Sequence, residues 1–568
     1  MDFEFIADPG ERPLPICCVA RELRSGREEV RWLEEPASPI LIPDSGVVLA
    51  YFASAELGCF LALGWKPPLH VLDLFTEFRL LTNGRENELS VEGKSLLAAL
   101  SFFGLAALDP DVKHQWRSRI LAGGPYTEEE RLGILDYCRS DVVALEALLT
   151  PLVEHLHRRS HWLAHALLRG RYMRAVAGIE RNGTPVDRLL FDAISTGWPS
   201  IQQRLVSETQ AEYPFYVDGT LKQDKLVEWA VQQGIPWPRT ASGRLALDGD
   251  TLKCLSRAHV EVEPLRQLLG HVGKLRVADV AVGKDDRNRV LLSPFSAQTG
   301  RNQPSGKRFI FAPSVWIRSL IRPEPGTALA YIDYASQEIG IAAALSGDTA
   351  MQRAYLSGDP YLSFAVDAGL APVGATKATH KRERERCKGL VLGTLYGMGE
   401  ATLATNLGIY PSEARRLLSA HRRVYSVFWA WAESTTGAAT LQGHIDTVFG
   451  WRRYVTSQTR PTSLLNHPMQ SHGAEILRLA CCFLTEAGIR VCAPVHDAVL
   501  IEAAADEIDD VVMKARSLME RASSIVLGGF VVRTEADILR FPDRYVDPRG
   551  VEMWEKVLSI LDDATDTV

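Results

Sequence analysis

Two aspartates in the second half of the chain are candidates for metal binding. Asp333 ends a β-branched and aromatic run, ALAYID, and a helical pattern follows it, so we expect Asp333 at the end of a strand. Asp497 lies between two apolar arms in VCAPVHDAVLIE, which predicts a hairpin with this residue at its tip. Two carboxylates that meet in a fold can hold two Mg²⁺ ions about 4 Å apart, the arrangement used for in-line phosphoryl transfer. Taken alone, each aspartate is more simply explained as a turn residue.

Between the two aspartates lies a four-residue repeat of a different kind. Arg384, Lys388, Leu392 and Tyr396 would form one slanting stripe, about 18 Å long, on a helix. The stripe is cationic at its amino end and apolar and aromatic at its carboxyl end. That order suits a triphosphate at one end and a base and sugar at the other. The alternative is a solvated, charged helix start that runs into a buried helix.

The first residues of the chain carry a further set of acidic side chains. Asp2 and Glu4 are two positions apart in DFEF, so on a strand they share one face. Tyr137 and Asp141 are four positions apart in DYCRSDV, so on a helix they also share a face. Each pair therefore presents its side chains in one direction.

The elements that position these residues follow from the hydrophobic pattern. Residues 1–150 alternate short β-like runs with helical stretches, which predicts one compact α/β domain. Residues 150–180 predict basic helical structure that ends at the turn signal Asn182-Gly183-Thr184-Pro185, the first expected boundary. From 186 to about 290 the pattern is mostly helical, and the tail predicts a helix with Met553, Val557 and Leu561 on one side, packed on the body.

Composition limits the classes of protein that remain. A chain of 568 residues, 46% hydrophobic and 23% charged, is typical of a globular protein with roughly three or four domains. The net charge of −7 excludes a globally basic nucleic-acid binder but permits a locally basic groove, and residues 301–330 carry five basic side chains and one acidic. Nine cysteines without a CxxC pair argue against a zinc site or a disulfide framework and indicate a reducing cytoplasm. An acidic start and the lack of a clean apolar span predict no signal peptide and no membrane helix.

The three carboxyl-terminal segments resemble, in order and spacing, motifs A, B and C of the family A DNA polymerases, the DNA polymerase I lineage. DYASQE at 333–338 is similar to motif A, RERCKGLVLGTLYG at 384–397 to motif B, and VHDA at 495–498 to motif C. Two further segments resemble the family's TGR segment and its N-x-P-M-Q helix: QTGRNQPSGKRFIF at 298–311 and NHPMQSHGAEILRLA at 466–480. Five motifs occur in the family's order over about residues 170–545. Jointly they argue against the alternatives in which Asp333 and Asp497 are only turn residues and the motif B stripe is only a solvated helix.

The resemblance implies a role for each matching residue. Asp333 and Asp497 would bind two Mg²⁺ ions, with Mn²⁺ as a substitute. Arg384 and Lys388 would bind the phosphates, with Lys388 as the proton donor to pyrophosphate.

The remaining matches imply contacts with the nucleotide and with DNA. Glu338 would pair with Tyr396 and close the space that a 2′-hydroxyl needs, while Tyr396 stacks near the templating position. The resemblance places two more side chains beside the nucleotide, Tyr334 and Leu392. It places four side chains at the primer terminus: Arg301 and Gln470, which read the minor groove, and Asn466 and His496.

Two positions depart from the family pattern. Motif C usually continues His-Asp-Glu, whereas Ala498 occupies the third position here, so we expect activity with an altered metal dependence. Leu392 stands where the family carries Phe or Tyr, so the family's discrimination against dideoxynucleotides does not transfer directly.

The amino-terminal pattern resembles the DnaQ-like 3′–5′ exonucleases of the DEDD type. The resemblance implies that Asp2, Glu4 and Asp141 hold two Mg²⁺ ions and that Tyr137 orients the attacking water. An active exonuclease is expected, and an inactive structural remnant is the alternative.

The middle motif of that family should be similar to His-Asn-x-x-x-Asp, but AYFASAE at 50–56 offers Ala53 and Glu56. Glu56 is therefore the expected third metal ligand, although its side chain is one methylene longer than aspartate. Asp73 is a weaker substitute and is better explained as a helix or strand cap. Because Met1 directly precedes Asp2, we expect the true start of the protein upstream.

Together these patterns predict a multidomain α/β protein. An RNase H-like exonuclease domain precedes a right-hand polymerase domain with palm, thumb and fingers. The expected segments are exonuclease 1–155, helical connector 156–185, thumb 186–290, palm with motif A 291–345, fingers 346–440, and palm with motif C and a terminal helix 441–568.

The expected function is template-directed DNA synthesis with proofreading, in DNA replication of a phage or plasmid type in the bacterial cytoplasm. The expected partners are primer–template DNA and dNTPs, without a membrane, and a monomer is expected; a helicase, primase or single-strand binding protein cannot be named from sequence. One rival is a single-subunit RNA polymerase, against which Glu338 and the exonuclease-like domain argue. The other is a nuclease whose carboxyl-terminal half only binds DNA.

Overall fold

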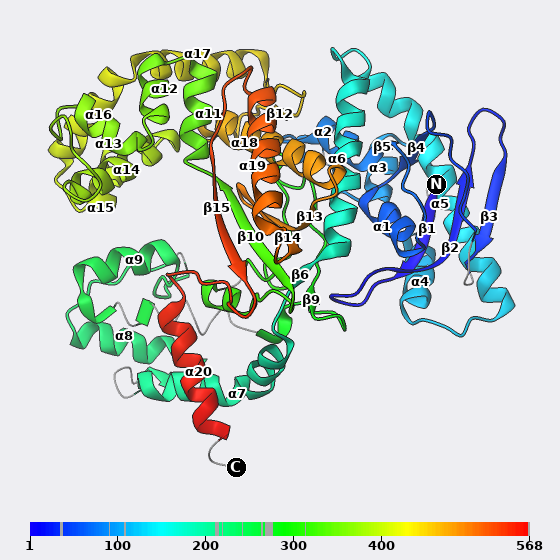
Figure 1. Cartoon of the computed structure of the whole chain (residues 1–568), viewed down its shortest axis with the longest axis horizontal. Helices are drawn as coiled ribbons and strands as arrows, with labels where there is room; N and C mark the ends of the chain where they lie inside the picture. Colours follow the sequence, from blue (N-terminus) through cyan, green and yellow to red (C-terminus); the bar gives the residue numbers. More distant parts are fainter. Residues whose placement is uncertain are drawn as a thin grey trace. The chain divides into compact units, whose positions relative to one another are not determined.

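The computed structural model shows two compact units (Figure 1). The first unit contains residues 1–183, 291–303 and 329–538, and the second contains 184–290, 304–328 and 539–568. The first boundary coincides with the predicted turn at Gly183. By contrast, residues 304–328 and 539–568 belong to the second unit and not to the expected palm segments 291–345 and 441–568. The structure describes residues 1–33, 38–89, 91, 93–106, 110–210, 215–217, 220–240, 242–262, 265–266, 277–312 and 314–565.

A three-stranded antiparallel sheet begins the first unit, in the order β1-β2-β3. In β1, Phe3 is buried while its neighbours Asp2 and Glu4 point to the other face, as the two-residue period of a strand requires. A helix, α5, packs on this sheet, and it begins at a capping box in which Thr127 and Glu130 each accept the other's backbone N–H. The elements are β1 (Asp2–Ile6), β2 (Leu14–Arg21), β3 (Glu28–Trp32) and α5 (Glu128–Leu156).

A parallel strand pair, β4 with β5, follows in the same unit. Asp73 ends β5 and caps α2: its carboxylate accepts the N–H of Phe75 and the hydroxyl of Thr76, and also the N–H groups of Phe52 and Ala53. The predicted role of Asp73 as a structural cap is therefore confirmed. The elements here are β4 (Val47–Ala50), α1 (Ser54–Ala62), β5 (His70–Asp73), α2 (Leu74–Thr82), α3 (Leu96–Phe102) and α4 (Pro110–Leu121).

Helix α6 (Trp162–Asn182) joins this amino-terminal part to the rest of the unit. It lies so close to β5 that a Cβ at Gly170 would sit 1.9 Å from the carbonyl oxygen of Val71, so only glycine fits there. A buried ion pair joins Arg169 of α6 to Glu77 of α2, with Nε 2.7 Å from Oε1. This packing makes the first 183 residues continuous with the carboxyl-terminal sheet in one unit.

The central sheet of the first unit has four strands in the order β13-β14-β10-β15. Helices α18 and α19 contact this sheet and each other, and α18 is buried along most of its length. The predicted strand before Asp333 and the predicted hairpin around Asp497 are both confirmed. The elements are β10 (Thr327–Tyr334), α18 (Pro461–Glu486), β13 (Arg490–Val495), β14 (Ala498–Ala504), α19 (Ile508–Val526) and β15 (Thr534–Arg540).

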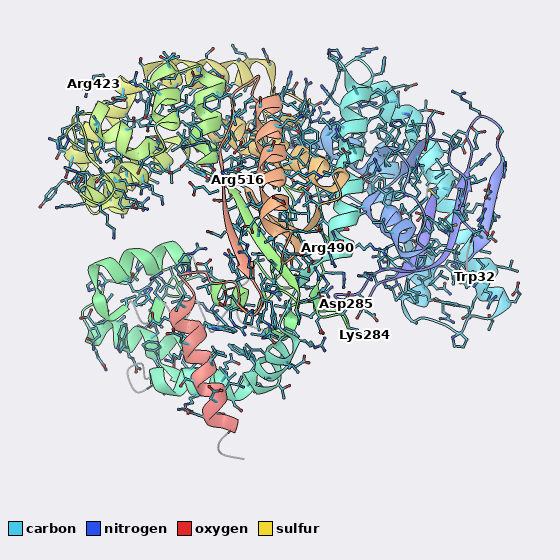
Figure 2. All side chains as sticks on the ribbon, viewed as in Figure 1. Trp32, Lys284, Asp285, Arg423, Arg490 and Arg516 are labelled. Atoms are coloured by element: carbon cyan, nitrogen blue, oxygen red, sulfur yellow. The ribbon has the colours of Figure 1, made fainter. Side chains whose placement is uncertain are left out.

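A group of helices lies between β10 and α18 in the sequence. The helix predicted for motif B is present as α14, and Gly389 within it faces Leu407, whose Cδ2 would be 2.7 Å from an added Cβ. On α16, His421 is fully buried, whereas Arg423 is exposed at the end of the helix (Figure 2). The elements are α11 (Gln337–Ser346), α12 (Thr349–Leu356), α13 (Pro360–Asp367), α14 (Lys381–Leu395), α15 (Glu400–Leu407), α16 (Pro411–Val424), α17 (Ser426–Gln442), β11 (His444–Asp446) and β12 (Arg452–Tyr454).

The second unit is mostly helical, as predicted. The rings of Trp198 and Trp316 stack with centroids 6.0 Å apart, and the tail helix α20 packs there with Val557 fully buried, which confirms the predicted packing of the tail. No described helix is long and apolar enough to cross a membrane. The elements are β6 (Thr184–Pro185), α7 (Arg188–Gln210), β7 (Tyr216–Val217), β8 (Thr220–Leu221), α8 (Gln223–Gln232), α9 (Gly249–Ala258), β9 (Arg287–Asn288) and α20 (Val551–Thr565).

Candidate active sites

Asp333 and Asp497 come together at the ends of neighbouring strands. β10 lies beside β14 in the sheet, and the N–H of Tyr334 donates to the carbonyl oxygen of Asp497 over 3.3 Å. Left-handed backbone occurs on both sides of this contact, at Ser336 (φ 52°) and at His496 (φ 57°). Such strained non-glycine residues cluster at functional sites. The structure thus unites two acidic residues that are far apart in the sequence.

The electrostatics of this pair, which we call the sheet-edge centre, favour a cation. Burial and the negative charges of Asp497, Glu535 and Asp537 raise the pKa of Asp333 to about 6. Burial also raises the pKa of Asp497, and the positive charge of Arg301 partly offsets that shift. Carboxylate oxygens are the donors that Mg²⁺ prefers, and a divalent ion would favour their ionised form. The donor set therefore fits Mg²⁺.

Sequence reasoning missed the two acidic residues of β15. Glu535 and Asp537 are exposed on a strand adjacent to β10, and they alternate in TEAD as side chains on one face do. That alternation was the available signal, but nothing local indicates that β15 pairs with β10.

A hydrogen-bonded triad lies on the helices next to the sheet-edge centre. The hydroxyl of Tyr396 donates to Oε1 of Glu338 over 2.6 Å, and Nε2 of Gln470 donates to the same oxygen over 2.6 Å. Nε2 of Gln470 also lies 2.9 Å from the Tyr396 hydroxyl. Burial and the bond to Glu338 raise the pKa of Tyr396 to about 12. The predicted pairing of Glu338 with Tyr396 is confirmed, and the participation of Gln470 in it is new.

The cationic end of the motif B stripe is partly engaged within the protein. Nε of Arg384 lies 2.5 Å from Oδ2 of Asp359, which also caps α13, and the guanidinium lies 5.4 Å from the centre of the Tyr361 ring. Lys388, one turn further along α14, is exposed. No local pattern indicates that Asp359 pairs with Arg384, because the two residues are 25 positions apart in the sequence.

The predicted primer contacts lie around the same region. The charge of Arg301 lowers the pKa of both Asp497 and Tyr396, so Arg301 interacts electrostatically with the sheet-edge centre and with the triad. Nε of Arg301 is buried without a hydrogen-bond partner among the described residues. Nδ2 of Asn466 donates to the carbonyl oxygen of Leu395 over 3.2 Å, which ties α18 to the end of α14.

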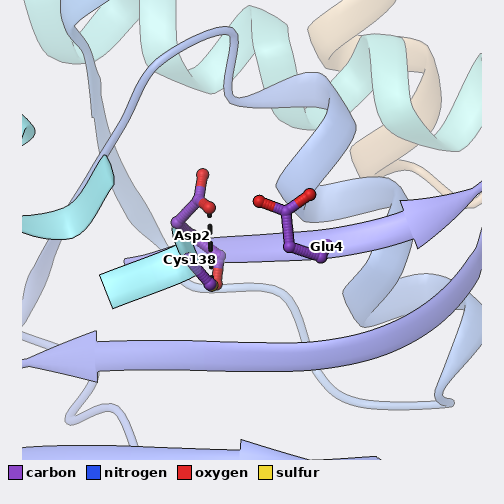
Figure 3. A group of neighbouring side chains, drawn as sticks. All are labelled: Asp2, Glu4 and Cys138. Carbon is purple, nitrogen blue, oxygen red and sulfur yellow. Dashed lines mark hydrogen bonds between the residues drawn. The ribbon is translucent and has the colours of Figure 1, made fainter. Parts of the chain in front are cut away.

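A second acidic group forms at β1 and α5 (Figure 3), and we call it the amino-terminal centre. Ligand atoms of Asp2, Glu4 and Cys138 all lie within 4.8 Å of one another, and Sγ of Cys138 donates to Oδ2 of Asp2 over 3.4 Å. Burial is the main cause that raises the pKa of Asp2 to about 7 and that of Glu4 to about 10. Cys138 was missed in the sequence, although it directly follows Tyr137 on the same helix.

Glu56, the expected third metal ligand, lies on α1. Its side chain is 6% exposed, and its Oε2 has no hydrogen-bond partner among the described residues. Burial and the charge of Asp2 raise its pKa well above the usual value. Asp141 contributes its charge to the same group, while its two oxygens bind Nζ of Lys113, and Tyr137 is largely buried beside them. Asp2 and Glu4 therefore come together with Cys138, the charges of Asp141 and Glu56 interact with that of Asp2, and this desolvated acidic group fits a site for a divalent cation.

Comparisons with known proteins agree with the carboxyl-terminal part of this picture. Residues 312–538 match the family described as DNA polymerase family A. The chain is 25% identical over 391 residues to a thermostable DNA polymerase I of Thermus thermophilus, covering 64% of this chain and 46% of that protein. It is 27% identical over 395 residues to a DNA polymerase of Mycobacterium phage L5, covering 67% of this chain and 62% of that protein.

The fold resembles a solved structure over most of its length. The POL domain of Pol1 from M. smegmatis, in complex with DNA primer-template and dNTP, matches with a TM-score of 0.68 and 19% sequence identity. The match covers 88% of this chain and 86% of that one. The chain spans between about half and two thirds of the length of the two polymerases described above.

Proposed function

We propose that the chain is a template-directed DNA polymerase that extends a primer 3′-hydroxyl with dNTPs, because residues 312–538 match the family described as DNA polymerase family A. The observation that carries the proposal is the meeting of Asp333 and Asp497 beside the triad of Glu338, Tyr396 and Gln470. A structure with primer-template and dNTP bound has the same overall fold, which supports these two partners.

The residues of the sheet-edge centre divide the reaction among them. Asp333 and Asp497 would hold Mg²⁺, which would supply activation of the 3′-hydroxyl and charge neutralisation on the triphosphate. The 3′-hydroxyl gives its proton to solvent, its oxygen forms a bond to the α-phosphorus, and the bond from that phosphorus to pyrophosphate breaks. Lys388, exposed on α14, gives a proton to the leaving pyrophosphate. Arg384 gives up its ion pair with Asp359 and binds the phosphates of pyrophosphate instead.

The triad selects the sugar. Glu338 and Tyr396 are bonded to each other over 2.6 Å, so their side chains form a fixed wall where a 2′-hydroxyl would need room. Gln470 donates to the same oxygen of Glu338. Gln470, Arg301, Asn466 and His496 would contact the minor groove of the primer end. This arrangement favours dNTPs over NTPs and argues against an RNA polymerase.

We further propose that the amino-terminal part is a 3′–5′ proofreading exonuclease with an RNase H-like fold. Asp2, Glu4, Glu56 and Asp141 supply carboxylates for divalent cations, and Tyr137 orients the attacking water. The similarity to a mycobacteriophage polymerase supports a replicative role of the phage or plasmid type. The exonuclease part follows the domain division expected from sequence, residues 1–155.

The direct test is extension of a labelled primer–template with and without Mg²⁺, with both lengthened and shortened products measured. We expect lengthening only with Mg²⁺ and all four dNTPs, and shortening when dNTPs are omitted. Asp333→Asn should abolish lengthening, whereas Asp510→Asn, at an exposed carboxylate on α19, serves as the matched control and should retain it. Full extension by the Asp333→Asn protein would contradict the proposed polymerase centre.

A further inference from the structure

Lys113 occupies one side of the amino-terminal centre. It lies on α4, and its Nζ is 2.8 Å from Oδ1 and 2.8 Å from Oδ2 of Asp141. The ammonium group also lies 5.6 Å from the centre of the Tyr137 ring. The side chains of the ion pair are only 19% and 15% exposed, so solvent screens them weakly. Both oxygens that Asp141 could offer to a metal ion thus already bind a fixed positive charge.

The other carboxyl groups of the centre have a different environment. Among the described residues, no Lys or Arg side chain forms an ion pair with Asp2, Glu4 or Glu56. The nearly buried carboxyl of Glu56 leaves Oε2 without a hydrogen-bond partner, and the charge of Asp2 acts on it. A buried carboxylate without a partner is costly unless it binds a cation. The Met1 ammonium group lowers the pKa of Asp2 and of Glu56, and both oxygens of Asp141 bind Lys113. Asp2 and Glu4, with Sγ of Cys138, are therefore the part of the centre whose ligand atoms lie close enough to share a metal ion.

We propose that Lys113 takes the place of a second metal ion, so that this centre holds a single divalent cation on Asp2 and Glu4. The proposal rests on the exonuclease function above and changes the ion count expected from the family resemblance. A divalent ion on Asp141 would have to displace the ammonium group from both oxygens and would then repel it at close range. Lys113 acts through Asp141, so it is a positioning residue that supplies charge and holds the carboxylate beside Tyr137.

The test counts bound Mn²⁺ in the full chain by the electron paramagnetic resonance signal of free Mn²⁺. Asp333→Asn with Asp497→Asn removes the ligands of the sheet-edge centre, and saturating dTMP, the product of 3′ degradation, completes the amino-terminal centre. In this background we expect one bound ion per chain. Adding Lys113→Ala should raise the count to two, and adding Lys113→Arg, which keeps the charge, should leave it at one.

A matched control is available in the same part of the chain. Lys66 pairs with Asp44 on the surface over 3.2 Å, and Lys66→Ala should leave one ion bound. Two ions with Lys113 present, or one ion both with and without it, would overturn the proposal. No bound ion in any variant would instead overturn the exonuclease function on which the proposal rests.

Degradation of a single-stranded oligonucleotide gives a second readout, measured in the chain with both centres intact. At low Mg²⁺ we expect Lys113→Ala to slow degradation about tenfold, and at high Mg²⁺ we expect a second ion to restore part of the rate. Faster degradation by Lys113→Ala at low Mg²⁺ would show that the lysine blocks the centre, and it would overturn the proposal. Circular dichroism of each variant separates these effects from loss of folding.

Discussion

The two acidic centres of this chain are both candidate sites for divalent cations, but their carboxyl groups have different surroundings. At the sheet-edge centre, Asp333 and Asp497 lie at strand ends near Arg301, and the pKa of Asp333 is raised to about 6. At the amino-terminal centre, desolvation and the neighbouring acidic groups raise the pKa values of Asp2 and Glu4 further, to about 7 and about 10. A carboxyl group whose pKa is raised more depends more on a bound cation for its ionisation. The centres should therefore differ in their response to metal and to pH.

The largest expected effect separates the two centres completely. Asp333→Asn should slow primer extension about 10³-fold, equivalent to about 4 kcal/mol of transition-state stabilisation, because it removes a metal ligand. The same variant should degrade single strands at the normal rate. Asp2→Asn combined with Glu4→Gln should show the reverse pattern, and gel assays of extension and degradation measure both. Loss of both activities in either variant would mean that the centres are not independent.

The triad next to the sheet-edge centre has no counterpart at the amino-terminal centre. Glu338→Ala removes the acceptor of both Tyr396 and Gln470 and opens the space beside the sugar. We expect discrimination against NTPs to fall about 10²-fold in single-nucleotide incorporation, with little change in 3′ degradation. Asp510→Asn is again the control, and unchanged discrimination in Glu338→Ala would show that the triad does not select the sugar.

The pH dependence of metal binding should distinguish the centres next. Protons compete with the metal for each carboxylate, so apparent affinity falls as the pH drops below the pKa of the ligands. Mn²⁺ binding at the amino-terminal centre should weaken already between pH 9 and 7, because Asp2 and Glu4 have pKa values of about 7 and about 10. The sheet-edge centre should hold its affinity to about pH 6. Titrations of single-centre variants measure this order, and a reversed order would contradict it.

The smallest expected effect is on stability without metal. Because the pKa of Asp2 is raised on folding, the unfolded chain ionises first as pH rises above about 4, and the free energy of unfolding decreases until about pH 7. Asp2→Asn removes this decrease in the free energy of unfolding. At pH 8 with a chelator we therefore expect the melting temperature of the Asp2→Asn protein to be about 2–4 °C higher than that of the unchanged chain. Asp333→Asn should raise it less, since its shift is smaller. Added Mg²⁺ should stabilise only the chain with intact ligands.

Much of the secondary structure follows from local pattern. The strand before Asp333, the hairpin around Asp497 and the helix of motif B could be predicted, because periods of 2 and 3.6 residues place side chains locally. The cap function of Asp73 could be predicted for the same reason. By contrast, the assignment of residues 304–328 and 539–568 to the second unit depends on contacts over hundreds of positions, such as the 2.9 Å ion pair of Arg318 with Asp547.

The sequence by itself determined which side chains could serve at each centre and on which face of a strand or helix they lie. Only the tertiary structure decided their partners: Gln470 on Glu338, Asp359 on Arg384, and Lys113 on Asp141. The physical reason is that partner choice and desolvation come from packing between distant segments, which no local period encodes. The same packing sets how strongly each carboxyl group is shifted toward its neutral form.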